Sequence, residues 1–425
     1  MAKMYPFRGY RYDQSTISDI SQVVTQPYDK ISPKLKKEYQ ERHPSNIVRI
    51  ILNSDYLEAA SLWHRWIQTS VLVQDSRPCL YIYRQDWTLE GEEISRTGII
   101  GLVSLDDDDL VVKGHETILD KPLEDRLRMI RATEANEGLI FTLYSDKDLK
   151  VDQALDSITG KLSPAIDMTD DFNVRNRVWC LHEEKIISTL TGLFRENPLY
   201  IADGHHRYQT SILYNRECGD KGWLPGAPES FDKRMIATFN MESPGLRILA
   251  THRAVRNVSG FDPQSLIKKA GNFFKAEKFE SLQRLREALS ETPHSIGLLV
   301  GKQTSFYLLS LRQGALEDGR FMPGVNGCRR ELDVTILHQA IFEDLLGIDA
   351  EQVTSGEHVS YFRDSDDLAA SVRSGRNQAG FVLRPTSLED VRRISEAGER
   401  MPQKSTDFFP KLLTGLVMMK MEIEK

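Results

Sequence analysis

Residues 199–208 read LYIADGHHRY, an apolar run that ends in polar and charged residues. The apolar residues before Asp203 are typical of a buried strand, and residues 208–217 form a helix-compatible pattern. Gly204 permits a tight turn between the two. The stretch therefore predicts a strand, a short loop and a helix. Free N–H groups at the helix start would lie beside a carboxylate, two imidazoles and a guanidinium, an arrangement suited to phosphate binding.

The side chains of this loop suit phosphate chemistry. Arg207 can donate two N–H groups to phosphate oxygens, and the two histidines can donate hydrogen bonds or move a proton near neutral pH. Asp203 can bind Mg²⁺ or accept a hydroxyl proton. In the alternative, Asp203 caps the helix and the histidines pack in a polar turn. We predict that Gly204, His205 and Arg207 bind phosphate, that Asp203 and His206 are catalytic, and that Asp203 is the metal ligand.

Composition excludes several classes of protein. The 425 residues suffice for two or three domains, and 40% hydrophobic residues can build buried cores. The net charge of −7 provides no excess of Lys and Arg for binding nucleic acid. No run resembles a signal peptide or reaches the roughly 18 apolar residues of a membrane span. We expect a cytoplasmic protein that acts on a small-molecule substrate and binds neither nucleic acid nor a membrane. For the oligomeric state, a homodimer is one alternative.

The cysteines form no metal-binding motif, whereas one acidic run could attract a metal ion. Cys79, Cys180, Cys218 and Cys328 are far apart and form no CxxC pair. Their spacing indicates neither a zinc knuckle nor a disulfide framework, so we expect reduced structural thiols. The acidic run 106–109 predicts a solvated turn, although it could attract a metal ion.

Apolar periodicity predicts helices and strands that alternate along the chain. Helices are expected over residues 54–70, 122–132, 262–274, 280–290, 334–346 and 387–397. Strands are expected over residues 79–86, 97–105, 234–240 and 296–300, and a short apolar run ends at 142–146. The mixture predicts an α+β (mixed α/β) fold.

Residues 114–117 read GHET and place a carboxylate beside an imidazole. Such a pair can provide a general base, here Glu116. A helix cap at Thr117 and a solvated Glu116 would explain the same residues.

The C-terminal region holds a second candidate anion site. Residues 401–406 read MPQKST, and Lys411 follows shortly after. Two lysines, two hydroxyl groups and exposed backbone amides can bind an anionic group. We predict Lys404, Ser405, Thr406 and Lys411 as phosphate-binding residues, with ordinary surface charge as the alternative for the lysines.

These segments together resemble the bacterial and archaeal family called domain of unknown function 1015 (DUF1015). The segments that carry the resemblance are Pro27-Tyr28-Asp29, Asn46 with Arg49, His115-Glu116-Thr117 with Asp125-Arg126, Asp203 to Arg207, Thr251-His252-Arg253, Leu332-Asp333-Val334, and residues 401–406 with Pro410-Lys411. They span nearly the whole chain in order. We expect these motifs to supply the substrate-binding residues, namely Tyr28, Asp29, Arg49, His115, Thr117, Arg126, His252 and Arg253.

A His-Glu pair, a helix with Arg126 and a strand ending in Asp-Gly-His-His-Arg are also similar to the ParB/sulfiredoxin-like fold, above all to its free serine kinases. This likeness implies that the loop binds donor phosphates and that Glu116 activates a serine hydroxyl. It implies a ParB/sulfiredoxin-like core with an insertion over residues 96–250. Residues 1–95 would form an N-terminal α/β extension, and residues 251–425 a C-terminal α/β region that contributes to the site.

The motifs and the resemblance together predict a phosphotransferase. It would move a phosphoryl group between ATP, ADP or pyrophosphate and a small hydroxyl acceptor, with serine as the leading candidate and Mg²⁺ as cofactor. Such chemistry needs mostly positioning and charge neutralisation. Glu116 would be the base beside Asp203 and His206. The alternative function is a non-catalytic nucleotide or phosphate-ligand sensor that acts on a protein partner.

Overall fold

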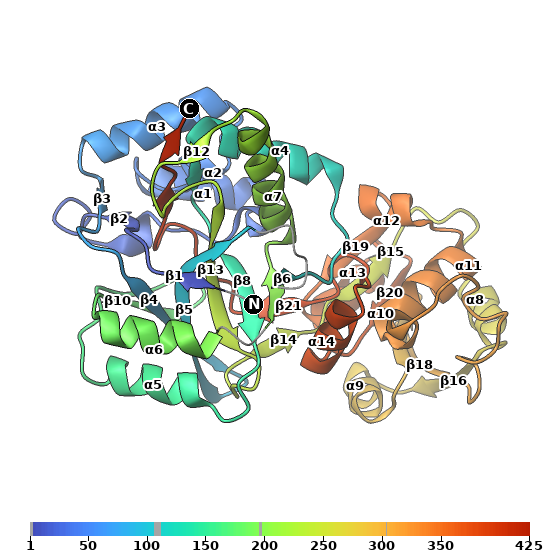
Figure 1. Ribbon diagram of the computed structural model, residues 1–425. Helices are drawn as coiled ribbons and strands as arrows, with labels where there is room; N and C mark the ends of the chain where they lie inside the picture. The colour runs from blue at the N-terminus through green and yellow to red at the C-terminus, as the bar shows by residue number, and fades with distance from the viewer. Residues whose placement is uncertain (1–2, 106–111, 195–197, 303) are drawn as a thin grey trace. The chain divides into compact units, whose positions relative to one another are not determined.

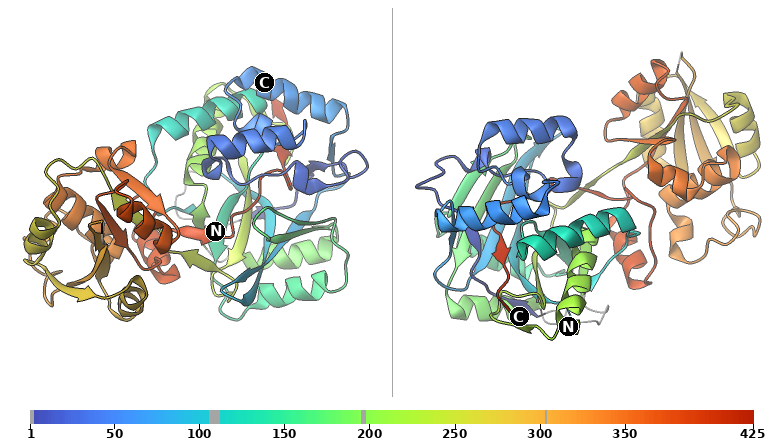
Figure 2. Two further views of the ribbon diagram at one scale, coloured as in Figure 1. Left: turned by 180° about the vertical axis from the view of Figure 1, so that it is seen from behind. Right: turned by 90° about the horizontal axis from the view of Figure 1, so that it is seen from above.

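The computed structural model describes residues 3–105, 112–194, 198–302 and 304–425 (Figures 1 and 2). The acidic run 106–109 lies outside these residues. The chain divides into two compact units. Unit 1 comprises Met1–Gly114, Ile118–Arg247 and Pro410–Lys425, and unit 2 comprises His115–Thr117 and Ile248–Phe409. This division differs from the three predicted regions, because the expected boundary after residue 95 falls inside one strand, β5 (Glu92–Ser104), and the end of the chain returns to unit 1.

Over the described residues, unit 1 is built on a nine-stranded sheet in the order β6-β11-β8-β13-β5-β4-β10-β9, with β1 also paired to β5. β11 runs parallel to β6 and β13 parallel to β8, whereas the other neighbours are antiparallel. The strands are β1 (Met4–Tyr5), β4 (Leu80–Leu89), β5 (Glu92–Ser104), β6 (Val112–Lys113), β8 (Ile140–Tyr144), β9 (Ile166–Thr169), β10 (Arg175–Leu181), β11 (Leu199–Asp203) and β13 (Lys233–Asn240). Shorter pairs join β2 (Tyr10–Tyr12) to β3 (Leu72–Gln74), β7 (Ala135–Asn136) to β22 (Met419–Lys420), and β12 (Leu224–Pro225) to β23 (Ile423–Glu424).

Helices cover the sheet of unit 1 with apolar stripes. Leu155 of α5 and Leu190 of α6 pack in one core with Ile201 of β11, and Figure 1 shows these two helices side by side. Elsewhere α4 packs against α3 and α7. The helical segments are η1 (Ile20–Gln22), η2 (Tyr28–Lys30), α1 (Pro33–Arg42), α2 (Val48–Ile51), α3 (Tyr56–Gln68), α4 (Asp120–Thr133), α5 (Lys150–Thr159), α6 (Glu184–Phe194) and α7 (His205–Asp220).

The returning segment Pro410–Lys425 is held by a buried arginine of unit 1. Arg96 donates hydrogen bonds to the carbonyl of Pro410 and to Oε1 of Gln85. Its guanidinium carbon lies 4.7 Å from the ring centroid of Phe141. A buried guanidinium is costly unless its N–H groups find acceptors, so this contact defines the path of the returning segment.

Over the described residues, unit 2 is built on a six-stranded antiparallel sheet in the order β16-β18-β17-β20-β15-β19. Leu285 of α9 and Leu368 of α13 pack with Leu299 and Val382 in its core. The strands are β15 (His252–Val255), β16 (Phe274–Phe279), β17 (Ser295–Val300), β18 (Ser305–Leu311), β19 (Val359–Phe362) and β20 (Ala379–Val382), with β14 (Arg247–Leu249) paired to β21 (Asp407–Phe409). The helical segments are α8 (Pro263–Ala270), α9 (Leu282–Glu291), η3 (Cys328–Glu331), α10 (Asp333–Ile336), the π-helical η4 (Leu337–Glu343), α11 (Asp344–Leu346), α12 (Ala350–Ser355), α13 (Ser365–Arg373) and α14 (Leu388–Glu396).

The structure confirms the prediction of a mixed α and β fold. Every helix and strand expected from apolar periodicity is present, with bounds that differ by a few residues. The cysteines provide one difference, because ligand atoms of Cys79, Cys180 and Asp75 lie within 4.8 Å of one another. Within the described residues, the helices are too short or too polar to cross a membrane.

A neutral histidine is buried in unit 2. His252 is 7% exposed, and its Nδ1 accepts the N–H of Leu383 at 3.3 Å. Burial, assisted by the charge of Arg253, lowers the pKa of His252 to about 4. The folded protein therefore keeps this ring neutral at pH values where the unfolded chain protonates it.

We expect acid to destabilise the protein through His252. Between the unfolded pKa of about 6.5 and the folded pKa of about 4, only the unfolded chain takes up this proton. The free energy of unfolding therefore decreases as the pH is lowered through this range, by up to about 3 kcal/mol. His252→Asn offers an oxygen in place of Nδ1 and does not titrate. Urea unfolding at pH 7 and pH 5 should show a smaller loss for this variant than for the wild type. Equal losses would contradict this role of His252.

Candidate functional site

The predicted strand, loop and helix over residues 199–208 are confirmed. β11 ends at Asp203, α7 begins at His205, and Gly204 joins them with φ of 94°. A Cβ atom at Gly204 would lie 3.0 Å from Nη2 of Arg207. Glycine is therefore needed both for the left-handed backbone and for the space beside Arg207. The N-cap position is Gly204, so Asp203 does not occupy the cap position that the alternative interpretation gave it.

Two cations of unit 1 flank the carboxylate of Asp203. Its Oδ2 lies 3.6 Å from Nη2 of Arg207 and 3.8 Å from Nζ of Lys411. Lys411 is only 5% exposed, so its ammonium group is held in this place by the surrounding chain. Positive charge thus gathers at the start of α7, where the helix dipole also favours an anion. Lys411 was grouped with Lys404 from the sequence, but the structure brings it to the Asp203 loop.

The two histidines of the loop face different surroundings. His206 Nε2 accepts the N–H of Leu119 at 2.9 Å, which places the proton of the neutral ring on Nδ1. His205 is 4% exposed. A Cβ atom at Gly114 would lie 3.1 Å from Cδ2 of His205, so the glycine lets the backbone pass close to this ring.

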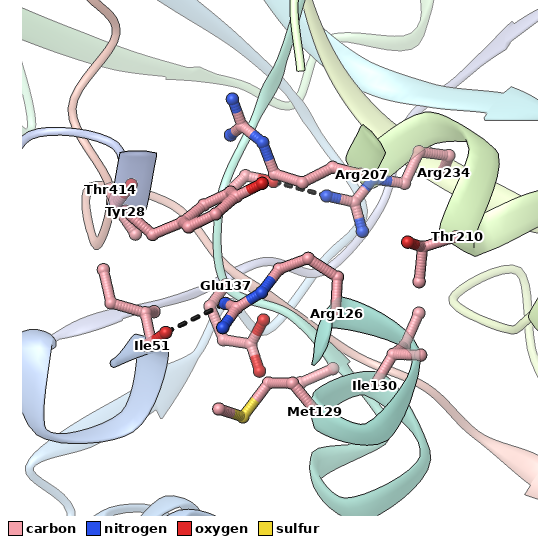
Figure 3. Close-up of a pocket in the computed structure, with 12 residues that line it drawn as sticks. Tyr28, Ile51, Arg126, Met129, Ile130, Glu137, Arg207, Thr210, Arg234 and Thr414 are labelled. Atoms are coloured by element: carbon pink, nitrogen blue, oxygen red, sulfur yellow. Dashed lines mark hydrogen bonds between the residues drawn. The ribbon is translucent and has the colours of Figure 1, made fainter. Parts of the chain in front are cut away.

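A pocket of unit 1 with a volume of about 40 Å³ reaches Arg207 (Figure 3). We call it the arginine pocket, because three arginines line it. Its walls combine these cations with one carboxylate, hydroxyl groups and apolar side chains. The lining residues are Tyr28, Ile51, Arg126, Met129, Ile130, Ala135, Glu137, Gly138, Arg207, Thr210, Arg234 and Thr414.

The three arginines of the pocket differ in their partners. Arg126 binds the carboxylate of Asp125 and donates Nη1 to the carbonyl of Ile51 at 2.8 Å, a bond drawn in Figure 3. Arg207 donates Nη1 to the carbonyl of Leu139 at 2.5 Å. Its Nε finds no hydrogen-bond acceptor among the described residues.

Arg234 lies deepest of these three cations. It is 4% exposed and donates Nη2 to the carbonyl of Gly138 at 2.7 Å. Within the described part of the chain, its Nε has no acceptor and its guanidinium has no carboxylate within ion-pair distance. Burial and the nearby charge of Arg207 lower the pKa of Arg234 to about 9, which leaves it a cation at neutral pH.

Tyr28 joins two of the predicted site residues. The guanidinium carbons of Arg126 and Arg207 lie 4.4 and 6.0 Å from its ring centroid. Burial raises the pKa of Tyr28 to about 12, so its hydroxyl group is a hydrogen-bond donor at neutral pH. Three residues that are far apart in the sequence thus meet in unit 1.

The sequence analysis did not identify several of the residues that line the arginine pocket. Arg234 and Glu137 were not singled out, and neither was Thr210. Arg234 does leave one signal, because it is a charged residue at the start of the apolar run of β13. Glu137 leaves none, since a single acidic residue in a connecting segment is usually solvated.

Two predicted substrate-binding residues of unit 1 lie outside the arginine pocket. Asp29 is exposed on η2. Arg49 donates hydrogen bonds to the backbone carbonyls of Gln40 and His43, so it supports the segment that follows α1. Neither residue lines the pocket.

In unit 2, the structure brings two predicted motifs together. The Met401 N–H donates to the His115 carbonyl at 2.7 Å, and Glu116 pairs with Met401 in a short parallel bridge. Thr117 donates its hydroxyl to the Met401 carbonyl at 3.4 Å, which differs from the helix cap considered for it. His115 Nε2 lies 3.1 Å from the Thr406 hydroxyl oxygen.

The segment around Lys404 is held by side chains of unit 2. Glu116 Oε1 accepts the Lys404 N–H at 3.0 Å, and the buried Arg253 donates Nη2 to the Lys404 carbonyl at 2.8 Å. Lys404 has φ of 57°, a left-handed conformation that is uncommon for a residue other than glycine. Ser405 donates its hydroxyl to the Pro402 carbonyl. These contacts impose a defined conformation on the loop.

The fit of Mg²⁺ can be judged from the donor atoms near Asp203. Among the described residues, Asp75, Cys79 and Cys180 form a group of three potential metal ligands whose ligand atoms lie close together. Asp203 belongs to no such group of three. Mg²⁺ commonly binds through one or two carboxylates and completes its shell with substrate phosphates and water. Asp203 therefore fits as a single protein ligand for an ion that arrives with a phosphate.

Comparison with known proteins places the chain in one family. No curated protein matches it. Similar solved structures include a free serine kinase variant in complex with AMP, with 11% identity, a TM-score of 0.38, and coverage of 73% of this chain and 87% of that one. A conserved hypothetical protein from Pyrococcus furiosus has 12% sequence identity and a TM-score of 0.36, and the match covers 73% of this chain and 91% of that one. C-terminally truncated SbnI from Staphylococcus aureus has 14% sequence identity and a TM-score of 0.37, and the match covers 74% of this chain and 85% of that one.

The family model described as protein of unknown function (DUF1015) matches residues 4–335. This match covers well over half of the chain and confirms the family resemblance expected from the motifs. The chain belongs to the DUF1015 family.

Proposed function

We propose that the protein is a phosphotransferase that moves a phosphoryl group between ATP, ADP or pyrophosphate and a small hydroxyl acceptor, with serine as the leading candidate. The observation that carries the proposal is the start of α7 in unit 1. There Arg207 and Lys411 lie 3.6 and 3.8 Å from Asp203, at the positive end of the helix dipole.

Cations and amides at the loop match the needs of phosphoryl transfer. The reaction depends mainly on neutralising phosphate charge and aligning the reacting oxygens. Arg207, Lys411 and the amides of Gly204 and His205 would hold the donor. Mg²⁺ bound at Asp203 would supply further neutralisation of the phosphate charge.

In this proposal, Glu116 takes the proton from the acceptor hydroxyl. It carries a carboxylate on a short, well-anchored segment of unit 2, with one oxygen bonded to the Lys404 N–H. The anchoring limits rotation of the carboxylate, and a positioned base contributes more than a mobile one. His206 would stabilise the donor or return a proton through Nδ1, while Arg253 and Ser405 would keep the Lys404 loop in shape.

Replacing the proposed base or the loop carboxylate should stop turnover. We expect Glu116→Gln and Asp203→Asn to lower phosphoserine formation by at least about 100-fold, since a general base contributes roughly 10²–10⁴. Glu116→Gln keeps an oxygen for the Lys404 N–H, so the fold should persist. The assay incubates protein, serine and Mg²⁺ with ATP, ADP or pyrophosphate and detects phosphoserine by mass spectrometry.

The exposed Glu124→Gln variant on α4 is the matched control for this experiment. Full activity in either Glu116→Gln or Asp203→Asn would refute the assigned mechanism. Tight donor binding without any product, for all three donors, would instead favour the sensor considered from the sequence.

Lys411 should contribute to donor affinity. A hydrogen bond to a charged group contributes about 1.5–3 kcal/mol, so Lys411→Met should weaken binding of ADP or pyrophosphate roughly 10- to 100-fold. Isothermal titration calorimetry measures this change, with the exposed Lys34→Met as control. An unchanged dissociation constant for both ligands would show that Lys411 only supports the fold.

A further inference from the structure

Two cysteines and one aspartate meet at one place in unit 1. One ligand atom each from Asp75, Cys79 and Cys180 lies within 4.8 Å of the other two. Asp75 and Cys79 belong to the segment between β3 and β4, and Cys180 lies in β10. Cys79 is fully buried, whereas Asp75 and Cys180 are partly buried. We call these three residues the thiol cluster, and none of them lines the arginine pocket.

The carboxylate of Asp75 has a fixed orientation in this cluster. Arg11 donates Nε to its Oδ2 at 3.0 Å and Nη2 to its Oδ1. Tyr81 donates its hydroxyl to Oδ2 at 2.7 Å and accepts the N–H of Gly9 at 2.7 Å. A Cβ atom at Gly9 would lie 2.5 Å from the Tyr81 hydroxyl oxygen, so glycine lets the backbone reach it. A carboxylate offers about four lone-pair sites, and these bonds from described residues use three, so Oδ1 keeps one for a further ligand.

The register of the sheet distinguishes the thiol cluster from a disulfide pair. Cys180 pairs with Tyr81 across the ladder of β4 and β10, so Cys79 is displaced by two residues from the position opposite Cys180. Diagonal neighbours of this kind have Cα atoms about 7–8 Å apart, whereas a disulfide usually joins Cα atoms about 4.4–6.8 Å apart. Two metal–sulfur bonds of about 2.3 Å each can span the longer gap without a change of register.

We propose that the thiol cluster binds one Zn²⁺ ion through Sγ of Cys79, Sγ of Cys180 and Oδ1 of Asp75, with water in the fourth position. Thiolates and a carboxylate are ligands that Zn²⁺ takes in tetrahedral sites. In such a site these ligand atoms lie about 3.6–3.8 Å apart. Ligand atoms that already lie within 4.8 Å of one another therefore need only a small movement to close around the ion.

The charges of the thiol cluster balance when the ion is bound. Each thiol gives up one proton on binding, so two thiolates and the Asp75 carboxylate carry three negative charges. Zn²⁺ and the Arg11 guanidinium supply three positive charges. Mg²⁺ prefers oxygen ligands and keeps several waters, so sulfur ligands favour Zn²⁺ over the cation proposed for Asp203.

The bound ion would link two segments of unit 1 that are far apart in the sequence. Asp75 and Cys79 lie in the connection that enters β4, and Cys180 lies in the neighbouring strand β10. Arg11 of β2 joins them through Asp75. An ion that binds the folded chain and not the unfolded chain raises its stability. We therefore expect this Zn²⁺ to stabilise unit 1, independently of the proposed function.

The experiment is a calorimetric titration of Zn²⁺ into the full chain, reduced and freed of metal with a chelator that is then removed. The variants are Cys180→Ser and Asp75→Asn, which change the ligand atom and keep the shape of the side chain. Cys328→Ser is the matched control, because Cys328 is also a partly buried thiol and lies in unit 2. Co²⁺ is the second ion, because thiolate ligands give it charge-transfer absorption and tetrahedral coordination gives it intense d–d bands.

We expect the wild type and Cys328→Ser to bind one Zn²⁺ with equal affinity. Cys180→Ser and Asp75→Asn should bind it at least about tenfold more weakly, because loss of a ligand costs no less than loss of a group that orients one. Zn²⁺ should raise the melting temperature of the wild type and the control by at least about 2 °C, but not that of Cys180→Ser. Zn²⁺ affinity that is unchanged by Cys180→Ser, or bound Co²⁺ without thiolate absorption, would overturn the proposal.

Alkylation of the wild type by iodoacetamide gives a readout that needs no variant to fold. Zn²⁺ should protect Cys180 from alkylation and leave the labelling of Cys328 unchanged, as peptide mass spectrometry would show. Equal labelling of Cys180 with and without Zn²⁺ would overturn the proposal. A disulfide between Cys79 and Cys180 after oxidation in air, in protein that binds no Zn²⁺, would overturn it in favour of a redox pair. Phosphoserine formation is measured separately, so the proposed function and this inference can fail independently.

Discussion

The return of Pro410–Lys425 to unit 1 is the constraint on which the site of that unit depends. Arg96 and Gln85 lie in neighbouring strands and donate hydrogen bonds to the carbonyls of Pro410 and Lys411. With the backbone held on both sides of this point, the side chain of Lys411 reaches the Asp203 carboxylate. The charges around Asp203 are therefore completed by a residue from the far end of the chain.

Buried arginines are used in two ways in this protein. Arg96 and Arg253 bond to backbone carbonyls and thereby anchor the returning segment of unit 1 and the Lys404 loop of unit 2. Arg234 has a single carbonyl partner within the described residues and faces a cavity. Burial lowers the pKa of each.

The two units carry different parts of the predicted machinery. Unit 1 holds the Asp203 loop, Lys411 and the arginine pocket, which together provide positive charge for anionic groups. Unit 2 holds Glu116 in a segment tied to Met401 and Lys404, which provides an oriented carboxylate. A phosphotransferase needs both kinds of group.

The mixed fold and the strand-loop-helix at Asp203 could be predicted from residue patterns, because apolar periodicity and a glycine with positive φ act over a few neighbouring residues. It also identified Tyr28, Arg126 and Arg207, which meet at one pocket. The tertiary structure was needed to place Lys411 beside Asp203 and to reveal Arg234 and Glu137 in the pocket lining. Their significance comes from burial and from partners distant in the chain, and neither property leaves a local pattern of residues.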